Sequence, residues 1–207
     1  AIIMVHGDYN GLVLPPYVAP IQAVVIPVAA NKPGVIPAAR ELAEMIKSAG
    51  VRVKLDESDK SPGWKFSEYE MKGVPIRIEI GPRDIEAGNV TIAKRNTGEK
   101  ITVKKEEMVS TVLKLIDEIH DEMYKKALTY LLDHVTEVHN MDELNAALEK
   151  GGYAKMMWCG EEECENKIKE LTNATSRCMP FNQIAFDTVC PVCGKKAAKV
   201  VLFAKAY

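Results

Sequence analysis

The chain has 207 residues, of which 47% are hydrophobic and 27% are charged, and its net charge is −2. These values are typical of a soluble globular protein with one large domain or two small ones. The near-neutral charge excludes a protein covered in Lys and Arg for unselective nucleic-acid binding. No stretch approaches the roughly 20 apolar residues of a membrane span, so we expect no membrane association.

The first twenty residues predict the remnant of a strand followed by an irregular, proline-rich connector. The chain opens on neither an initiator Met nor the basic and apolar regions of a signal peptide, so we expect a piece of a longer protein. Without a secretory signal, cysteines near one end favour metal binding in a reducing compartment, the cytoplasm, over disulfides.

A βαβ unit is predicted next. Residues 22–28 are a β-branched run typical of a buried strand. Residues 35–49 have a helical apolar period, with Pro37 in the first turn and Gly50 as the stop. Residues 51–55 alternate like a second strand. Short links between these elements predict a parallel pair of strands.

The rest of the chain divides between two domains. The first continues with a polar loop over 56–63, a short helix over 66–71, a strand over 76–80 that Gly81-Pro82 ends, a hairpin of 90–93 and 101–103, and a long amphipathic helix over 109–123. The second is expected to hold a helix over 123–149 broken near 139–142, a strand over 154–158, a helix from Glu161, and a strand pair flanking 190–194.

The predicted fold class is therefore an α/β domain, with a mixed sheet flanked by helices, followed by a small α+β domain. We place a remnant of an upstream core and its linker at 1–20, the α/β domain at 21–122, and the α+β domain at 123–207. Between residues 72 and 105, eight basic residues outnumber four acidic ones, which predicts either a local nucleic-acid-binding patch or an ordinary solvated surface.

Four of the five cysteines form two closely spaced pairs, Cys159 with Cys164 and Cys190 with Cys193. Both spacings let two thiolates reach one tetrahedral ion, and the proline and glycine of the second pair favour a tight turn. Unrelated thiols or a redox pair are the alternatives. Two pairs in one short domain predict zinc, and four cysteines leave no open coordination position, so the predicted site is structural.

The fifth cysteine, Cys178, has no partner at ligand spacing. We therefore expect a small, buried, apolar residue at this position.

Several motifs occur together along the chain: His6-Gly7-Asp8 with Gly11-Leu12-Val13-Leu14-Pro15-Pro16, Pro62-Gly63-Trp64-Lys65-Phe66, Arg77-Ile78-Glu79-Ile80-Gly81-Pro82-Arg83-Asp84, the cysteine spacing, and a terminal Tyr207. Together they resemble the C-terminal half of prolyl-tRNA synthetases of the archaeal and eukaryotic type. The resemblance covers essentially the whole chain. Tyr9-Asn10 departs from it, because the family more often has Asp followed by Lys or Arg.

The resemblance implies an anticodon-binding domain followed by a zinc-binding domain, with tRNA(Pro) as partner. It implies that the two guanines shared by proline anticodons are contacted by Glu70, Arg77, Arg83 and Asp84. Lys94 and Arg95 are expected to contact phosphates, which position the RNA without specifying its sequence. The implied zinc ligands are Cys159, Cys164, Cys190 and Cys193.

The parent enzyme would join proline to its tRNA through an ATP-dependent adenylate. The resemblance places no catalytic residue in this chain, although His6, Asp8 and Tyr207 would lie near the parent's active site. ATP and Mg²⁺ would belong to the upstream catalytic core, which would also form a homodimer. We expect a cytoplasmic parent, no membrane or DNA partner, and no activity from this chain alone.

The residue patterns by themselves leave other readings open. Without the resemblance, Arg77 would be an exposed strand charge and Glu70 an ordinary helix residue. Trp64 and Phe66 could form a stacking platform for bases or pack in the core. A stand-alone RNA-binding accessory module and a zinc-ribbon adaptor between proteins are the alternative functions.

Overall fold

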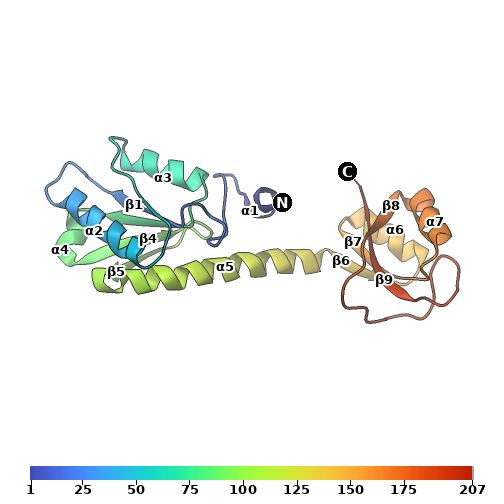
Figure 1. Ribbon diagram of the computed structural model, residues 1–207. Coiled ribbons are helices and arrows are strands. Elements are labelled where there is room, and N and C mark those ends of the chain that lie inside the picture. The colour runs from blue at the N-terminus through green and yellow to red at the C-terminus, as the bar shows by residue number, and fades with distance from the viewer. Residues whose placement is uncertain (207) are drawn as a thin grey trace. The chain divides into compact units, whose positions relative to one another are not determined.

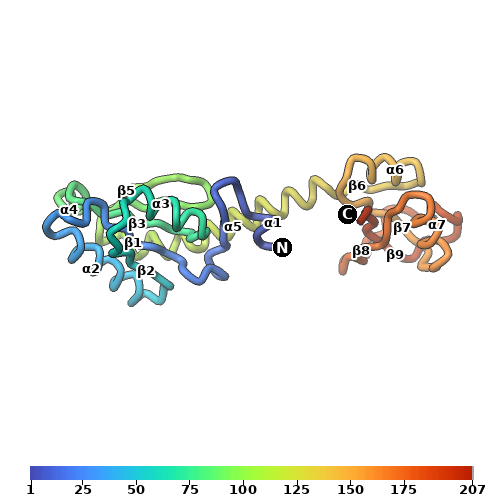
Figure 2. The backbone as a smooth tube through the Cα atoms, turned by 90° about the horizontal axis from the view of Figure 1, so that it is seen from above, coloured from blue at the N-terminus to red at the C-terminus, as the bar shows by residue number. Residues whose placement is uncertain are grey.

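The computed structural model describes residues 1–206 and divides into two compact units, Ala1–Ala127 and Leu128–Tyr207 (Figure 1). The backbone trace in Figure 2 follows the same elements from another side. Tyr207, which sequence analysis placed near the parent's active site, lies outside the described residues. Within residues 1–206, no helix is both long enough and apolar enough to cross a membrane.

The first unit is built on a five-stranded mixed sheet with the order β2-β1-β3-β4-β5. Its strands are β1 (Ala23–Pro27), β2 (Val53–Leu55), β3 (Ile76–Ile80), β4 (Asn89–Lys94) and β5 (Lys100–Lys104). β1 pairs in parallel with both β2 and β3, whereas β4 pairs antiparallel with both β3 and β5. The predicted βαβ unit, hairpin and mixed sheet are thereby confirmed.

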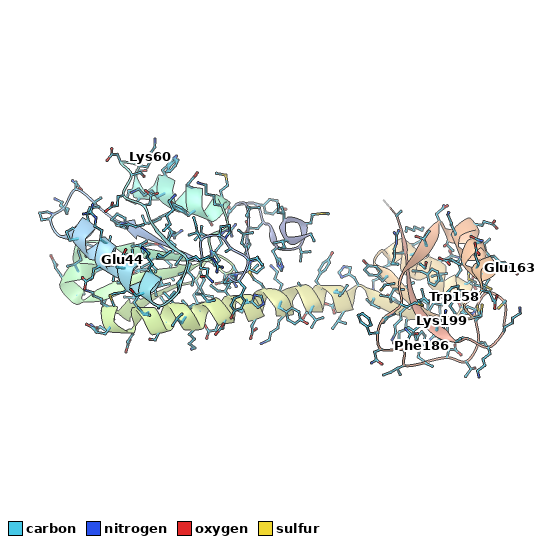
Figure 3. The ribbon with its side chains drawn as sticks, in the orientation of Figure 1. Glu44, Lys60, Trp158, Glu163, Phe186 and Lys199 are labelled. Atoms are coloured by element: carbon cyan, nitrogen blue, oxygen red, sulfur yellow. The ribbon has the colours of Figure 1, made fainter. Side chains whose placement is uncertain are left out.

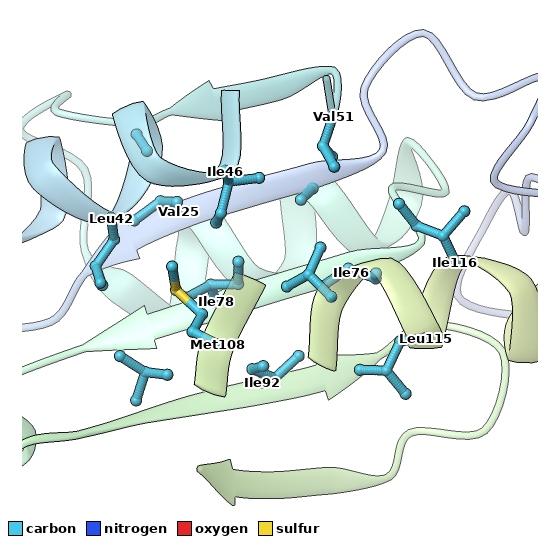
Figure 4. Packing of buried hydrophobic residues seen from close by; sticks show 14 of the residues in the cluster. Val25, Leu42, Ile46, Val51, Ile76, Ile78, Ile92, Met108, Leu115 and Ile116 are labelled. Carbon is cyan, nitrogen blue, oxygen red and sulfur yellow. The ribbon is translucent and has the colours of Figure 1, made fainter. Parts of the chain in front are cut away.

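One face of this sheet carries the main core under α2 (Val35–Ser48) and α5 (Met108–Asp133). Alternate residues of the central strands point at the two helices, among them Val25, Ile76, Ile78 and Ile92 (Figure 4). They are fully buried. This burial explains why the isoleucines of β3 alternate with charged residues, since only one face of the strand meets these helices.

The opposite face packs against α3 (Pro62–Met71) around a smaller cluster that includes Val24, Ile26 and Tyr69. α3 begins four residues earlier than predicted. The Ser61 hydroxyl accepts a hydrogen bond from the Trp64 N–H, and Pro62 occupies the first turn, where no N–H is needed. Both are start signals that the sequence prediction passed over.

A short helix, α4 (Pro82–Ala87), follows β3 directly, where sequence analysis expected only a break. Gly81 and Pro82 end the strand and also start a helix, because proline is compatible with the first helical position. The Asp84 carboxylate accepts a hydrogen bond from the Gly81 N–H at 2.9 Å and so caps this helix. Asp84 therefore has a structural role besides any contact with a ligand.

The expected strand remnant at the start of the chain is wrong, because Ile2–His6 form a short helix, α1. This apolar run has no neighbouring strand to pair with and closes local hydrogen bonds instead, from Val5 to Ala1 and from Gly7 to Ile3. The connector after it is irregular, as predicted. Arg52 holds its end by donating to the carbonyl oxygens of Pro16 and Ala19, each at 3.0 Å.

The second unit contains a four-stranded mixed sheet with the order β6-β7-β9-β8. Its elements are β6 (Val135–Val138), α6 (Met141–Lys150), β7 (Tyr153–Trp158), α7 (Glu162–Thr172), β8 (Ala174–Cys178) and β9 (Lys199–Lys205). Its core includes the fully buried side chains of Leu144, Met156, Ile168 and Phe203. The strand over 154–158, the helix after Glu161 and the small α+β character agree with the predictions.

Two expectations for this part of the chain are wrong, and one is confirmed. α5 continues to Asp133, and the stretch expected to be helical after it forms β6, which pairs in parallel with β7. The strand pair expected to flank the second cysteine pair is present, because β8 and β9 pair antiparallel on either side of it and a bridge joins Val189 and Lys196 closer in. Cys178 is exposed, because β8 is an edge strand whose last residues leave the core.

Candidate nucleic-acid interface and candidate metal site

Glu70 and Arg77 line one pocket of the first unit, although they come from α3 and β3. The pocket has a volume of about 140 Å³, and Tyr69, Val74, Ala93 and Gly98 complete much of its wall. Glu70 is half-buried, and its carboxylate accepts a hydrogen bond from the Asn10 side chain at 3.3 Å. A carboxylate and a guanidinium thus border the same small cavity.

Arg77 is held by two neighbours. Its Nε donates a hydrogen bond to Glu79 Oε1 at 3.0 Å, and its Cζ lies 4.2 Å from the centre of the Phe66 ring. Glu79 also pairs with Lys100, whose Nζ lies 2.9 Å from Oε1. On the same side of the sheet, β5 exposes Lys100 and Thr102. Charged and polar side chains therefore continue from the pocket across β3 and β5.

Arg83 and Asp84 occupy the first turn of α4 and do not line the Glu70–Arg77 pocket. Arg83 is exposed, and it has no ion-pair partner within residues 1–206. Asp84 is half-buried and caps the helix. The structure thus brings the four predicted anticodon residues together as two pairs, one in a pocket and one on a helix start.

Lys94 and Arg95, which were expected to contact phosphates, already hold carboxylates. Lys94 is buried and lies 2.7 Å from Glu122. Burial acts to lower the pKa of Lys94, but the hydrogen bond and charge of Glu122 more than offset it and raise this pKa. A phosphate contact by Lys94 would require this pair to open.

Arg95 forms a bidentate pair with Asp8, with Nη1 2.7 Å and Nη2 2.6 Å from its two oxygens. Its Nε donates to the Glu70 carbonyl oxygen at 2.8 Å. The hydrogen bonds that Asp8 accepts, chiefly those from the Arg95 side chain, lower the pKa of Asp8 to about 2. Asp8 thus ties the connector to the pocket wall, while His6 stays half-buried at the end of α1.

A glycine allows the connector to lie close to the end of α3. Gly73 has a φ of +71°, and a Cβ there would lie 2.7 Å from the Leu12 backbone. Leu12 in turn donates a hydrogen bond to the Met71 carbonyl oxygen at 2.9 Å. The connector therefore runs directly along the end of α3, next to Glu70.

Trp64 and Phe66, which the sequence left as either stacking or core residues, differ in position. The Trp64 side chain is exposed (48%) and has the Lys60 ammonium 5.5 Å from its ring centre, so core packing is not its role. Phe66 is half-buried against the small cluster under α3 and also lies beneath Arg77. Sequence analysis gave no role to Glu79 or Lys100, although the i, i+2 spacing of Arg77 and Glu79 puts both on one face of a strand.

The second unit brings the four predicted metal ligands together. The sulfur atoms of Cys159, Cys164, Cys190 and Cys193 all lie within 4.8 Å of one another. Cys164 and Cys190 are buried, Cys159 is half-buried and Cys193 is exposed. Four thiols at this separation can hold one metal ion with tetrahedral ligands.

Each cysteine is delivered by a defined piece of backbone. β7 ends at Trp158, whose carbonyl oxygen accepts a hydrogen bond from Ala198 at 2.8 Å, and Lys199 of the neighbouring β9 lies 5.7 Å from the indole (Figure 3). Cys164 lies in the first turn of α7. Cys190 accepts a hydrogen bond from Gly194 at 2.8 Å, which closes the turn that the proline and glycine predicted.

The surroundings of the thiols match a metal site. Burial acts to raise the pKa of Cys190, but the backbone N–H groups of Cys193, Val192 and Cys159 point at its sulfur and lower this pKa to about 7. Burial raises the pKa of Cys159 and, with help from neighbouring thiols, that of Cys164. Several buried sulfurs ionise together only when a cation balances their charge.

Comparison with known proteins agrees with this division of the chain. Residues 22–115 match the family model described as "Anticodon binding domain", and residues 141–207 match the model "Prolyl-tRNA synthetase, C-terminal". The first match covers the mixed sheet with the Glu70–Arg77 pocket. The second covers the cysteine cluster.

Relatives with the name proline–tRNA ligase match the whole chain. Those of Lachnospira eligens and Clostridium botulinum are 50% identical over 208 residues, and that of Oceanobacillus iheyensis is 47% identical over 207 residues. The chain spans 43% of the length of each of these relatives. The chain therefore resembles the C-terminal part of prolyl-tRNA synthetases, with an anticodon-binding domain followed by the C-terminal domain of that family.

Proposed function

We propose that this chain reads the anticodon of tRNA(Pro) for a parent enzyme that attaches proline to that tRNA. The observation that carries the proposal is the pocket bordered by the Glu70 carboxylate and the Arg77 guanidinium, which lies inside the segment that matches the anticodon-binding family. Single-stranded bases are recognised through hydrogen bonds to their exposed edges, so such a pocket suits an unstacked anticodon base.

The chemistry of guanine fits these side chains. Every proline anticodon contains two adjacent guanines, and the Watson–Crick edge of guanine offers two donors, N1–H and the amino group, that one carboxylate can accept. Its O6 and N7 are acceptors for the fork of an arginine. Glu70 with Arg77 would serve one guanine, and Arg83 with Asp84 the other.

Backbone contacts would come from basic side chains around these residues. Lys94 and Arg95 stay the proposed phosphate contacts, on condition that their pairs with Glu122 and Asp8 exchange for the RNA. Lys100 is half-exposed and borders the same surface.

For the second unit, we propose one zinc ion on the four cysteines. The chemistry of the donor set supports this ion, because four sulfur ligands at tetrahedral spacing favour zinc and leave no position for a substrate. The role would be to stabilise the unit.

The proposal for the parent goes further than this chain. Proline activation with ATP and Mg²⁺, and dimer formation, would belong to the part of the relatives that the chain does not span. The chain alone would not activate proline, and the parent would act in the cytoplasm, without membrane or DNA partners.

Arg83→Ala tests the anticodon proposal. Its affinity for tRNA(Pro) should fall by about 1–3 kcal/mol, because an arginine fork on guanine is lost. The loss should largely disappear with a tRNA whose anticodon guanines are replaced. Arg40→Ala is the matched control, since this exposed arginine of α2 pairs with Glu57 and lies outside both residue pairs.

Two outcomes would contradict the proposal. An equal loss with both tRNAs would make Arg83 a phosphate contact. Unchanged tRNA binding after substitution of Glu70, Arg77, Arg83 and Asp84 would favour the alternative of an adaptor between proteins.

A further inference from the structure

We propose that Glu79, together with Phe66, is a positioning residue that aims the two terminal nitrogens of Arg77 at the N7 and O6 edge of an anticodon guanine. The inference rests on the proposed function and deepens it. It concerns a buried residue that is not itself expected to touch RNA.

The first observation is which nitrogen of Arg77 is in use. Nε donates to Glu79 Oε1 at 3.0 Å, whereas Nη1 and Nη2 have no hydrogen-bond partner in the part of the chain that the structure describes. Arginine and carboxylate often pair through two parallel hydrogen bonds instead. Arg95 does so here, with both of its Nη atoms on Asp8. Arg77 thus keeps its fork free, beside a pocket that it lines.

The second observation is that the plane of the guanidinium is also fixed. Its Cζ lies 4.2 Å from the centre of the Phe66 ring, a distance typical of stacking between arginine and an aromatic face. A hydrogen bond at Nε and a ring beneath the plane leave this side chain little freedom. Less rotamer entropy is then lost when the fork binds a base.

The third observation is the position of Glu79 itself. It is only 9% exposed, in the interior of β3, and it accepts from Lys100 as well as from Arg77. A buried carboxylate is costly unless it is paired, and two cations contact this one. Glu79 is thereby held rigidly enough to orient Arg77.

The experiment measures binding of the full 207-residue chain to an anticodon stem-loop RNA of tRNA(Pro). At each anticodon guanine in turn, guanosine is replaced by 7-deazaguanosine, which lacks the N7 acceptor and keeps the Watson–Crick edge. The unmodified chain should lose roughly tenfold in affinity at the guanine that Arg77 contacts. Arg77→Ala should bind more weakly and show no further loss at that position.

Glu79→Leu and Phe66→Leu should behave like Arg77→Ala, with a 7-deaza effect below about threefold, because the fork is present but no longer aimed. Glu79→Gln keeps an acceptor for Nε and should restore most of the effect. Lys114→Met is the matched control, since Lys114 is an exposed lysine of α5 that pairs with Glu118 and contacts none of these residues, and it should retain the full effect. Circular dichroism confirms folding, and Phe66→Leu keeps the test open if Glu79→Leu does not fold.

A tenfold 7-deaza effect that persists in both Glu79→Leu and Phe66→Leu would overturn this inference, and so would its absence from the unmodified chain at both guanines. Both results leave recognition of the Watson–Crick edge by the carboxylates, and with it anticodon reading as the proposed function, in place. That function would fail separately if the unmodified chain bound a stem-loop with adenosine at both positions as tightly as the proline sequence.

Discussion

The Asp8–Arg95 pair allows a quantitative test of how the connector is held to the anticodon-binding unit. The perturbation is Asp8→Asn, which keeps the shape of the side chain and removes its charge. Asp8 now accepts two hydrogen bonds from the Arg95 guanidinium and a third from the Asn10 N–H at 2.9 Å. The asparagine oxygen can keep only part of this set.

The magnitude follows from the pKa and the exposure of the pair. The pKa of Asp8 falls from its ordinary 3.8 to about 2, chiefly through the hydrogen bonds from Arg95. If solvent did not screen the pair, a fall of this size in the pKa would correspond to roughly 2.5 kcal/mol of stability. The Asp8 side chain is 43% exposed, whereas that of Arg95 is 6% exposed, so solvent screens the pair from the carboxylate side. We expect a loss of about 1 kcal/mol in the free energy of unfolding.

The sign of the pH dependence follows from the same shift. The pKa of Asp8 is lower in the folded state, so its contribution is complete well above pH 3.8 and is lost as the pH falls toward 2. Asparagine does not titrate. The difference in stability between the two proteins should therefore be constant from neutral pH to about pH 5, should be mostly lost by pH 2 and should vanish near pH 1.

Urea unfolding across this pH range measures the difference, and hydrogen exchange at the Leu12 amide, which donates to Met71, reports whether the connector opens locally. Asp59→Asn is the matched control, because Asp59 is exposed and has no ion pair within the described residues. Equal stability of the two variants, or a difference that stays constant down to pH 2, would refute a stabilising role for the pair.

Two further predictions concern the metal site and a buried charge. Cys164→Ser should abolish the binding of about one zinc per chain and unfold the second unit, since a hydrophobic core of this size supplies only about 3–5 kcal/mol of stability. Cys178→Ser is the control, because it changes an exposed thiol and should leave the zinc content and the circular dichroism unchanged. Equal zinc loss in both variants would contradict the assignment. Lys65→Met should destabilise the first unit by about 2–3 kcal/mol in urea unfolding, because it leaves the buried Asp56 carboxylate without its cation. Lys65 is 1% exposed, and its ammonium donates to the Asp56 carbonyl oxygen at 2.9 Å and lies 3.6 Å from the Asp56 carboxylate. The exposed Lys60→Met should change it by less than about 0.5 kcal/mol, and a similar small effect of Lys65→Met would show that the buried pair contributes nothing.

The sequence predicted those elements whose signal is local. The alternation of Ile76, Ile78 and Ile80 reports directly on the two faces of β3, and the period of α2 reports on one buried stripe. β6 was missed because a strand of four residues is stabilised by its pairing with β7, and no local pattern reveals this partner. α1 was missed for the opposite reason, since an apolar run without a partner strand closed its own hydrogen bonds.

The same distinction explains the candidate sites. The cysteine pairs were predictable because each pair needs only one turn of backbone, and the fold then brings both pairs together. The Arg95–Asp8 pair joins residues 87 positions apart, and the stacking of Arg77 on Phe66 joins a strand to a helix. Neither contact has a signature in sequence spacing, so Arg95 was assigned to phosphate without its partner being known.

The cysteine cluster also bears on the stretch between its two pairs. Residues 179–189 form no helix or strand, and the side chains of Met179, Phe181 and Ile184 are exposed. Gln183, which hydrogen-bonds the Val200 backbone, and Phe186, which packs against a small buried cluster, anchor the rest of the segment. An ion held by all four sulfurs would join Cys164 to Cys190 and act as a cross-link that closes the chain segment between them. Such a cross-link stabilises the fold by restricting the unfolded chain, whatever residues lie within the loop. The exposed positions of the segment could therefore change at little cost, provided that its two ends stay on the metal and that Gln183 and Phe186 keep their contacts.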